Sequence, residues 1–271
     1  MPFTPAHVAA VLPFVGRARP GWAVPSALVI GSMVPDVLYF VPVRSDRELS
    51  HSLAGILTLD LALGLLLVGL WRVVAAPVLR DLVPLEVHDR VPAPRRPTSR
   101  EWLWAGPGLV LGSLTHVVWD GFTHGSGWAV RLLPVLTETV VRGQPAFKLA
   151  QYGSGLVGVV LVVGFGLRAL AVSSPDHCDS RLATPMERTT AWLALVVVPV
   201  LSALVFAVSA VRAGASTEVI LYTAVVRGVS GLGVVATGVA VWWHCWVRPH
   251  GAPPAAPTSA TPTGRTAGRG G

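Results

Sequence analysis

Three ionisable side chains stand four residues apart in residues 115–124, which read Thr-His-Val-Val-Trp-Asp-Gly-Phe-Thr-His. A four-residue step advances an α-helix by about 400°, so His116, Asp120 and His124 would follow one helix face. Imidazole and carboxylate groups on one stripe form a ligand set typical of zinc and similar divalent metals. The spacing therefore predicts a metal site, whereas a single histidine at this position would more often be an ordinary interfacial residue.

The rest of the chain is strongly apolar, as is typical of an integral membrane protein. Hydrophobic residues make up 52% of the 271 residues, charged residues only 13%, and the mean hydropathy is +0.60. A soluble domain has about 25% charged residues. We therefore predict an all-α, polytopic membrane helical bundle. Arginine supplies nearly all of the basic side chains, and together with abundant Ala, Val, Gly and Pro this favours a GC-rich bacterial source and location in the plasma membrane.

The apolar segments predict the helices of this bundle. A helix needs about 20 apolar residues to cross the bilayer core, and six segments are close to this length. A short N-terminal helix precedes them. The first segment is the weakest candidate, because Pro35 and Asp36 interrupt it. In chain order the six segments are residues 23–43, 52–76, 102–119, 153–172, 191–211 and 219–247.

Composition divides the chain into three regions. Residues 1–172 form the predicted membrane domain that carries the metal site. They include residues 77–100, which are rich in proline and charge and are expected to form a cytoplasmic loop. Residues 173–248 form a C-terminal scaffold of two spans with few polar side chains. Residues 249–271 contain too little apolar bulk to fold and are expected to be a disordered tail.

The distribution of basic residues predicts the topology. The chain carries 21 Lys and Arg against 14 Asp and Glu, and most of the arginines outside the apolar segments fall on one side of the predicted bundle. Cytoplasmic loops carry such an excess, so we interpret the charge as topology rather than as affinity for nucleic acid. The C-terminal tail is then cytoplasmic, and the His116 stripe lies at the outer end of the third span.

Other ionisable residues reach the same depth under this topology. Asp36 and His51 lie at the outer ends of the first two spans. His7 joins them if residues 5–17 form a short helix that turns back at residues 20–22. Ionisable groups within a membrane domain are costly and mark functional sites, so six of them at one depth favour a metal site. The predicted ligands are His7, Asp36, His51, His116, Asp120 and His124.

Asp60 is expected to lie outside this site. It follows His51 by nine residues, which places it about 900° around the helix and about 13 Å deeper. A contact with Arg227 in the last span or with a neighbouring hydroxyl is its expected role. The hydroxyls that would orient the imidazoles, or else bond to helix carbonyls, are those of Thr115, Thr123 and Ser52.

Several longer motifs occur in a distinctive order. They are Met-Pro-Phe-Thr-Pro-Ala-His at residue 1, Pro-Ser-Ala-Leu-Val-Ile-Gly-Ser-Met-Val-Pro-Asp at residue 25, Ser-His-Ser-Leu-Ala-Gly at residue 50, Leu-Thr-His-Val-Val-Trp-Asp-Gly-Phe-Thr-His at residue 114 and Leu-Ala-Gln-Tyr-Gly-Ser at residue 149. This set resembles a bacterial membrane family, the domain-of-unknown-function family 4184, clearly over residues 1–170 and more loosely beyond. The family has no established activity, so the resemblance implies a membrane location and little more.

The order His, Pro-Asp, Ser-His-Ser, His-x-x-x-Asp is also similar to that of inner-membrane metal-dependent hydrolases and, more distantly, of zinc-dependent phospholipase C and the P1-type nucleases. This resemblance implies that the same six residues bind zinc, with Asp36 and Asp120 as the catalytic carboxylates and Asp120 bridging two metals. The chain departs from those soluble enzymes, because it begins with Met-Pro rather than Trp and because His177, His244 and His250 lack an acid four residues on. One or two ions are therefore expected, rather than three.

The function expected from these features is metal-dependent hydrolysis within a membrane. A zinc-like ion would lower the pKa of a bound water towards ~7 and polarise a phosphoester. The substrate would be a phospholipid or lipid-linked phosphate that reaches the site from the outer leaflet, so the lipid bilayer is the expected partner. One alternative is a transporter, which a continuous polar path through Asp60 and Arg227 would favour. Another is a structural protein that binds metal for stability alone.

Overall fold

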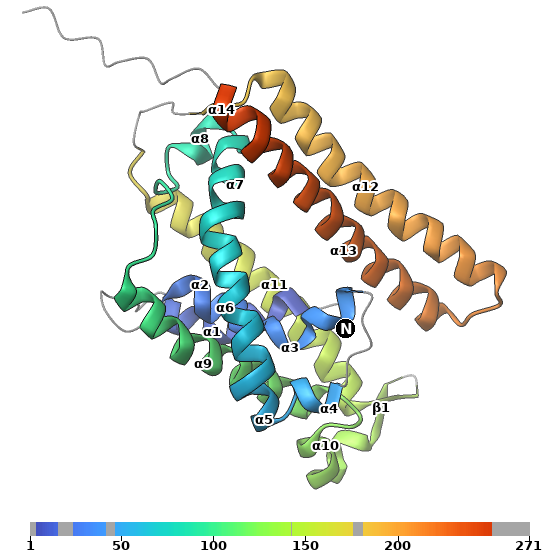
Figure 1. Ribbon diagram of the computed structural model, residues 1–271. Coiled ribbons are helices and arrows are strands. Elements are labelled where there is room, and N and C mark those ends of the chain that lie inside the picture. The colour runs from blue at the N-terminus through green and yellow to red at the C-terminus, as the bar shows by residue number, and fades with distance from the viewer. Residues whose placement is uncertain (1–3, 16–23, 42–46, 142, 176–180, 251–271) are drawn as a thin grey trace, which may run out of the picture.

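The computed structural model describes residues 4–15, 24–41, 47–141, 143–175 and 181–250 (Figure 1). Within these ranges almost every element is a helix. The strands described are β1 (Thr139–Val141) and β2 (Gln144–Pro145), which pair antiparallel next to the short helices α10 (Trp128–Leu132) and η5 (Pro134–Thr137). The predicted all-α class is confirmed.

Four helices are long and apolar enough to cross a membrane. They match the second, fourth, fifth and sixth expected segments, and the helix η1 (Thr4–His7) with α1 (Val8–Val15) supplies the short N-terminal helix. The prediction of a helical membrane protein is thus confirmed. The four spans are Leu53–Leu82, which joins α5 (Leu53–Gly55), the π-turn η3 (Ile56–Asp60), α6 (Leu61–Leu70), the π-turn η4 (Trp71–Ala75) and α7 (Ala76–Leu82); α11 (Ala146–Val172); α12 (Pro185–Arg212); and Thr217–His250, which joins α13 (Thr217–Trp242), η6 (Trp243–Val247) and α14 (Arg248–His250).

The first expected span is not one continuous helix. It is divided into α2 (Pro25–Gly31), α3 (Val34–Val37) and η2 (Leu38–Phe40). Pro35 causes the break, because it has no N–H and its ring would clash with the carbonyl of Gly31 if the helix continued. Residues 20–22, where the chain was expected to turn, lie outside the described residues. Helix α1 nevertheless packs against α2, as the predicted hairpin requires.

The third expected segment forms the central helix α9 (Ser99–Thr123), which packs against α2, α6 and α11 (Figure 1). It is not among the four apolar spans. Thr98 and Glu101 form a capping box at its start. The pKa of Glu101 is lowered to about 2, because its carboxylate accepts hydrogen bonds from the Thr98 backbone N–H and from Arg95 and also faces Arg72.

Two glycines let α2 and α9 approach closely. A Cβ added to Gly112 would lie 2.5 Å from the carbonyl oxygen of Leu28 and 2.6 Å from the backbone nitrogen of Ser32, and one on Gly31 would meet the backbone of Leu109. A side chain at either position would therefore force the two helices apart. This contact sets the distance between the broken first segment and the His116 stripe.

The beginning of the expected cytoplasmic loop, residues 77–82, is helical, so this part of the prediction is wrong. The long helix continues through α7 to Leu82, and α8 (Leu85–His88) follows it. Val78 and Leu82 are buried against Ala191 of α12 and against Ala240 and Trp243 of the last span. This contact anchors one end of the C-terminal hairpin of α12 and α13 (Figure 1). Farther along α13, Ser230 Oγ donates to the carbonyl of Phe40 at the end of η2. Proline-rich composition alone did not reveal the apolar face of α7.

The carboxylate of Asp81 fastens this hairpin to α7. It accepts hydrogen bonds from the backbone N–H groups of Leu182 and Ala183 and, at 2.6 Å, from the indole Nε1 of Trp243. We expect Asp81→Asn to lower the free energy of unfolding by about 1–3 kcal/mol, because an amide leaves a buried donor without an acceptor. Thermal melting in detergent measures this, and Glu86→Gln, which removes an exposed charge on α8, serves as the control. Equal melting temperatures for the two variants would contradict the expectation.

Candidate metal centre

All six predicted ligands meet at one end of α9. His116 and Asp120 project from α9 itself, and His124 is the residue at which the helix ends. His7 closes η1, Asp36 lies in α3, and His51 lies between α4 (Arg47–Ser50) and the start of the long span. The convergence predicted from the sequence is therefore present in the fold, although the residues come from separate elements.

Four of these side chains surround one point. The Nε2 atom of His51 lies 3.7 Å from Asp36 Oδ1 and 3.3 Å from Asp120 Oδ2. The Nε2 atom of His116 lies 3.6 Å from each of the same two oxygens. All four ligand atoms lie within 4.8 Å of one another. We call this set of Asp36, His51, His116 and Asp120 the four-residue cage.

The spacing within the cage suits a tetrahedral metal better than a hydrogen-bond network. Zinc bonds of about 2.0–2.1 Å to nitrogen and oxygen place tetrahedral ligands about 3.3–3.4 Å apart, whereas hydrogen bonds between such atoms are typically about 2.7–3.2 Å. Asp36 and His116 are both 0% exposed, and Asp36 Oδ1 and His116 Nε2 have no hydrogen-bond partner among the described residues. Buried polar atoms of this kind are costly unless a ligand satisfies them.

The remaining two predicted ligands meet the other oxygen of Asp120. His7 Nε2 lies 3.1 Å and His124 Nδ1 3.2 Å from Asp120 Oδ1. Neither histidine belongs to the four-residue cage, but the rings of His7 and His116 stack with centroids 4.0 Å apart. Asp120 therefore faces the cage with one oxygen and the pair of His7 and His124 with the other.

Backbone carbonyls fix the orientation of two imidazoles. His116 Nδ1 donates to the carbonyl oxygen of Ser32 at 2.8 Å, and His7 Nδ1 donates to that of Thr4 at 3.2 Å. Each bond places the proton on Nδ1 and leaves the Nε2 lone pair directed towards a carboxylate. In a continuous α-helix the Ser32 carbonyl would accept a hydrogen bond from the N–H of Asp36. At the break between α2 and α3 this N–H donates to the carbonyl of Met33 instead, which leaves the Ser32 carbonyl available to His116.

Side chains that the sequence reasoning missed complete the surroundings. Thr4 Oγ1 donates to Asp36 Oδ2 at 2.7 Å, Ser50 Oγ lies 3.0 Å from His51 Nδ1, and the Gln151 amide lies 2.8 Å from His124 Nε2. All three residues occur in the motifs that carry the family resemblance, which was the available signal. Such contacts hold ligands in place before any metal arrives.

The hydroxyls expected to orient the imidazoles have other partners, with one exception. Thr115 donates to the carbonyl of Gly112, and Ser52 donates to that of Leu49 while it accepts the N–H of Gly55. These are the ordinary helix contacts that the sequence left open as the alternative. Thr123 lies 3.2 Å from His124 Nδ1, although it also donates to the carbonyl of Trp119.

Asp60 is not a member of the cage but is closer to it than expected. It is 1% exposed, neither carboxylate oxygen has a hydrogen-bond partner among the described residues, and it interacts electrostatically with His116. The expected contact with Arg227 is wrong, because that guanidinium stacks on the ring of Phe206, 5.0 Å from its centroid, on an exposed part of α13. The π-turn that ends at Asp60 alters the helix phase on which the expectation rested.

A polar cavity of about 490 Å³ connects the cluster to the surface. His51, Asp120 and His124 form its inner wall, and the exposed side chains of Glu48 and Arg131 stand among its outer residues. Arg131 is held by a 2.7 Å hydrogen bond from its guanidinium to the carbonyl of Ser126. Water and small polar molecules can therefore reach Asp120 from the side of α4 and α10.

Comparison with known proteins agrees with the motif resemblance. The model of a protein family described as a domain of unknown function (DUF4184) matches residues 1–242, a range that includes all six predicted ligands and the C-terminal hairpin. No curated protein and no solved structure matches the chain. By the extent of this match, the chain belongs to the DUF4184 family.

Proposed function

We propose that this chain is a membrane-embedded, metal-dependent hydrolase that cleaves a phosphoester of a lipid or lipid-linked substrate. The observation that carries the proposal is the four-residue cage, in which each of two imidazole nitrogens lies 3.3–3.7 Å from each of two carboxylate oxygens. Buried carboxylates and imidazoles at this spacing are typical of a zinc-like site. The adjoining polar cavity gives the site access to water, which a hydrolase requires.

The donor set fits zinc in one or two positions. The cage would hold the first ion through His51, His116, Asp36 and Asp120. A second ion would be held by His7 Nε2, His124 Nδ1 and the other oxygen of Asp120. The second position offers fewer protein ligands than the first, and it would therefore be filled at higher metal concentration and be more open to a substrate.

The reaction is the addition of water across a phosphoester bond. A divalent ion supplies two effects when bound, a lower pKa for water and polarisation of a phosphoryl oxygen. The oxygen of water forms the new bond to phosphorus, the ester P–O bond breaks, and one proton of the water ends on the departing alcohol. The carboxylates of Asp36 and Asp120 would hold the ion and balance its positive charge. The backbone carbonyls of Ser32 and Thr4 would keep the imidazoles of His116 and His7 oriented during the reaction.

The proposed orientation places this site at the outer face of a bacterial plasma membrane and the C-terminal tail in the cytoplasm. The excess of arginine on the opposite side supports it. The cluster lies beside the first turns of α11, because Gln151 contacts His124, and Lys148 of the same turns pairs with Glu218 at the start of α13. These helix starts would share one membrane surface, where lipid headgroups are within reach.

The transporter alternative has less support from the fold. It needs a continuous polar path through the helices, formed by Asp60 and Arg227. Asp60 is enclosed beside α9, whereas Arg227 lies on an exposed part of the C-terminal hairpin and contacts Phe206. The two side chains therefore do not line a shared path.

Hydrolysis of phospholipids by purified, zinc-loaded protein in mixed micelles tests the proposal. Asp36→Asn is expected to lower the rate of phosphoester cleavage by at least about 100-fold, because the charge stabilisation supplied by an ion is worth several kcal/mol. Glu138→Gln removes an exposed carboxylate outside the cluster and is the matched control. Zinc uptake into liposomes without cleavage of any lipid phosphoester would replace the proposal with transport.

A further inference from the structure

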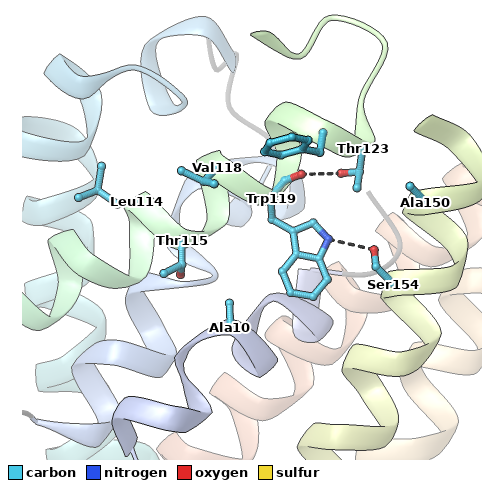
Figure 2. Close-up of a pocket in the computed structure, with 9 residues that line it drawn as sticks. Ala10, Leu114, Thr115, Val118, Trp119, Thr123, Ala150 and Ser154 are labelled. Carbon is cyan, nitrogen blue, oxygen red and sulfur yellow. Dashed lines mark hydrogen bonds between the residues drawn. The ribbon is translucent and has the colours of Figure 1, made fainter. Parts of the chain in front are cut away.

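A second hollow lies on the opposite face of α9 from the polar cavity. It is an open groove of about 570 Å³ between α1, α9 and α11, with almost wholly apolar walls (Figure 2). Ala10 of α1 and Ala150 of α11 form two of its sides, and Val118 and Phe122 of α9 are exposed along it. We call this hollow the apolar groove.

The apolar groove adjoins the metal centre. Trp119 and Thr123 line the groove and also line a narrow gap whose other walls include His7, His124 and Gln151. The Trp119 indole Nε1 donates a hydrogen bond to Ser154 Oγ (Figure 2), with 3.0 Å between the two atoms. The Trp119 ring centroid lies 5.5 Å from that of His7. One layer of side chains therefore separates the groove from the histidines that face Asp120 Oδ1.

The position of the groove along the helices suits a lipid. Ala150 and Ser154 lie four and eight residues into α11, or about 6 and 12 Å from its first residue. A helix of 27 residues spans the hydrocarbon core and part of the headgroup layer. With the first turn of α11 at headgroup level, the groove would run from that level at Thr123 towards the bilayer interior at Leu114, about 13 Å away along α9.

The chemistry of the walls selects the occupant. An apolar hollow offers water few hydrogen bonds, and at this depth the surrounding medium is lipid. We propose that the apolar groove binds one hydrocarbon chain of a phospholipid whose phosphate lies at the Thr123 end, one layer of side chains from His7 and His124. This inference rests on the proposed function and extends it, because it assigns the lipid chain and the water to opposite faces of α9.

Lipid retention in native mass spectrometry tests the groove without relying on hydrolysis. Delipidated wild-type protein in detergent is mixed with a long-chain phosphatidic acid, or with glycerol phosphate as the chainless probe. We expect one phosphatidic acid to remain bound and no glycerol phosphate to be retained at the same concentration. Ala150→Phe fills the groove and is expected to weaken phosphatidic acid binding about tenfold or more, since each excluded methylene loses its burial.

Two further Ala→Phe variants control for misfolding and for the general effect of a larger side chain. Ala10→Phe fills the groove from a different helix, so it replaces Ala150→Phe if that variant fails to fold. Ala169→Phe makes the same change at an exposed position near the other end of α11 and is expected to leave retention unchanged. Retention in both groove variants equal to that of the wild type overturns the groove. Loss of lipid in those variants, in a protein that takes up no metal, supports the groove and overturns the hydrolase alone.

Discussion

Asp120→Asn is expected to abolish metal binding at both positions, because this carboxylate is the one group that faces the four-residue cage with one oxygen and His7 and His124 with the other. An amide offers one oxygen and carries no charge, so neither position keeps its ligand set. The loss in metal affinity should exceed the roughly 10–100-fold loss that follows removal of a residue that only hydrogen-bonds to a metal ligand. Elemental analysis of protein purified without chelator measures the ions bound per chain.

Asp60→Asn is the matched control for this prediction. It removes a carboxylate that is equally enclosed and also interacts with His116, but that lies outside the cage. Its metal content at saturating zinc should equal that of the wild type. Retention of metal by Asp120→Asn together with loss from Asp60→Asn would show that the ion lies elsewhere in the bundle.

Histidine variants are expected to separate the two proposed positions. His116→Ala removes one of two cage imidazoles and should abolish tight binding at the first position, because the cage then keeps three of its four ligands and loses a nitrogen donor. His7→Ala leaves the cage intact and should lose the second ion alone. A calorimetric titration with zinc should therefore show no tight binding step in the His116→Ala protein and a tight binding step in the His7→Ala protein.

The stacking of His7 on His116 provides the main complication in this comparison. His7→Ala removes a ring 4.0 Å from that of His116 and could loosen it. His124→Ala avoids this, because His124 meets the cluster through Asp120 Oδ1 and the Gln151 amide. If His7→Ala and His124→Ala both lose the tight step, the division of the site into two positions is wrong.

Much of the cluster could be predicted from the sequence because α9 is a regular helix. The four-residue spacing of His116 and Asp120 depends only on helix periodicity, and these residues do share a face. The return of His7 to the level of Asp36 followed from a short helix over residues 5–17 and an expected turn at residues 20–22, which lie outside the described residues. Both inferences used local geometry, which a sequence specifies well.

The parts that the sequence did not predict depend on contacts between distant segments. Pro35 breaks the first expected span, and only the packed structure shows that the freed Ser32 carbonyl accepts a bond from His116. The burial of Asp81 likewise depends on partners 102 and 162 residues away in the chain. The expected contact of Asp60 with Arg227 was wrong, because a π-turn ends at Asp60 and Arg227 contacts Phe206 in the C-terminal hairpin.

X-ray absorption at the zinc edge, on wild-type protein purified without chelator, tests whether these histidines and aspartates bind a metal ion. We expect a zinc signal well above background, with nitrogen and oxygen ligands at about 2.0–2.1 Å and an outer-shell pattern from imidazole rings. The same spectrum from Asp120→Asn protein should lose this signal. A wild-type spectrum at background, or one dominated by sulfur ligands at about 2.3 Å, would contradict a metal centre built from these histidines and aspartates.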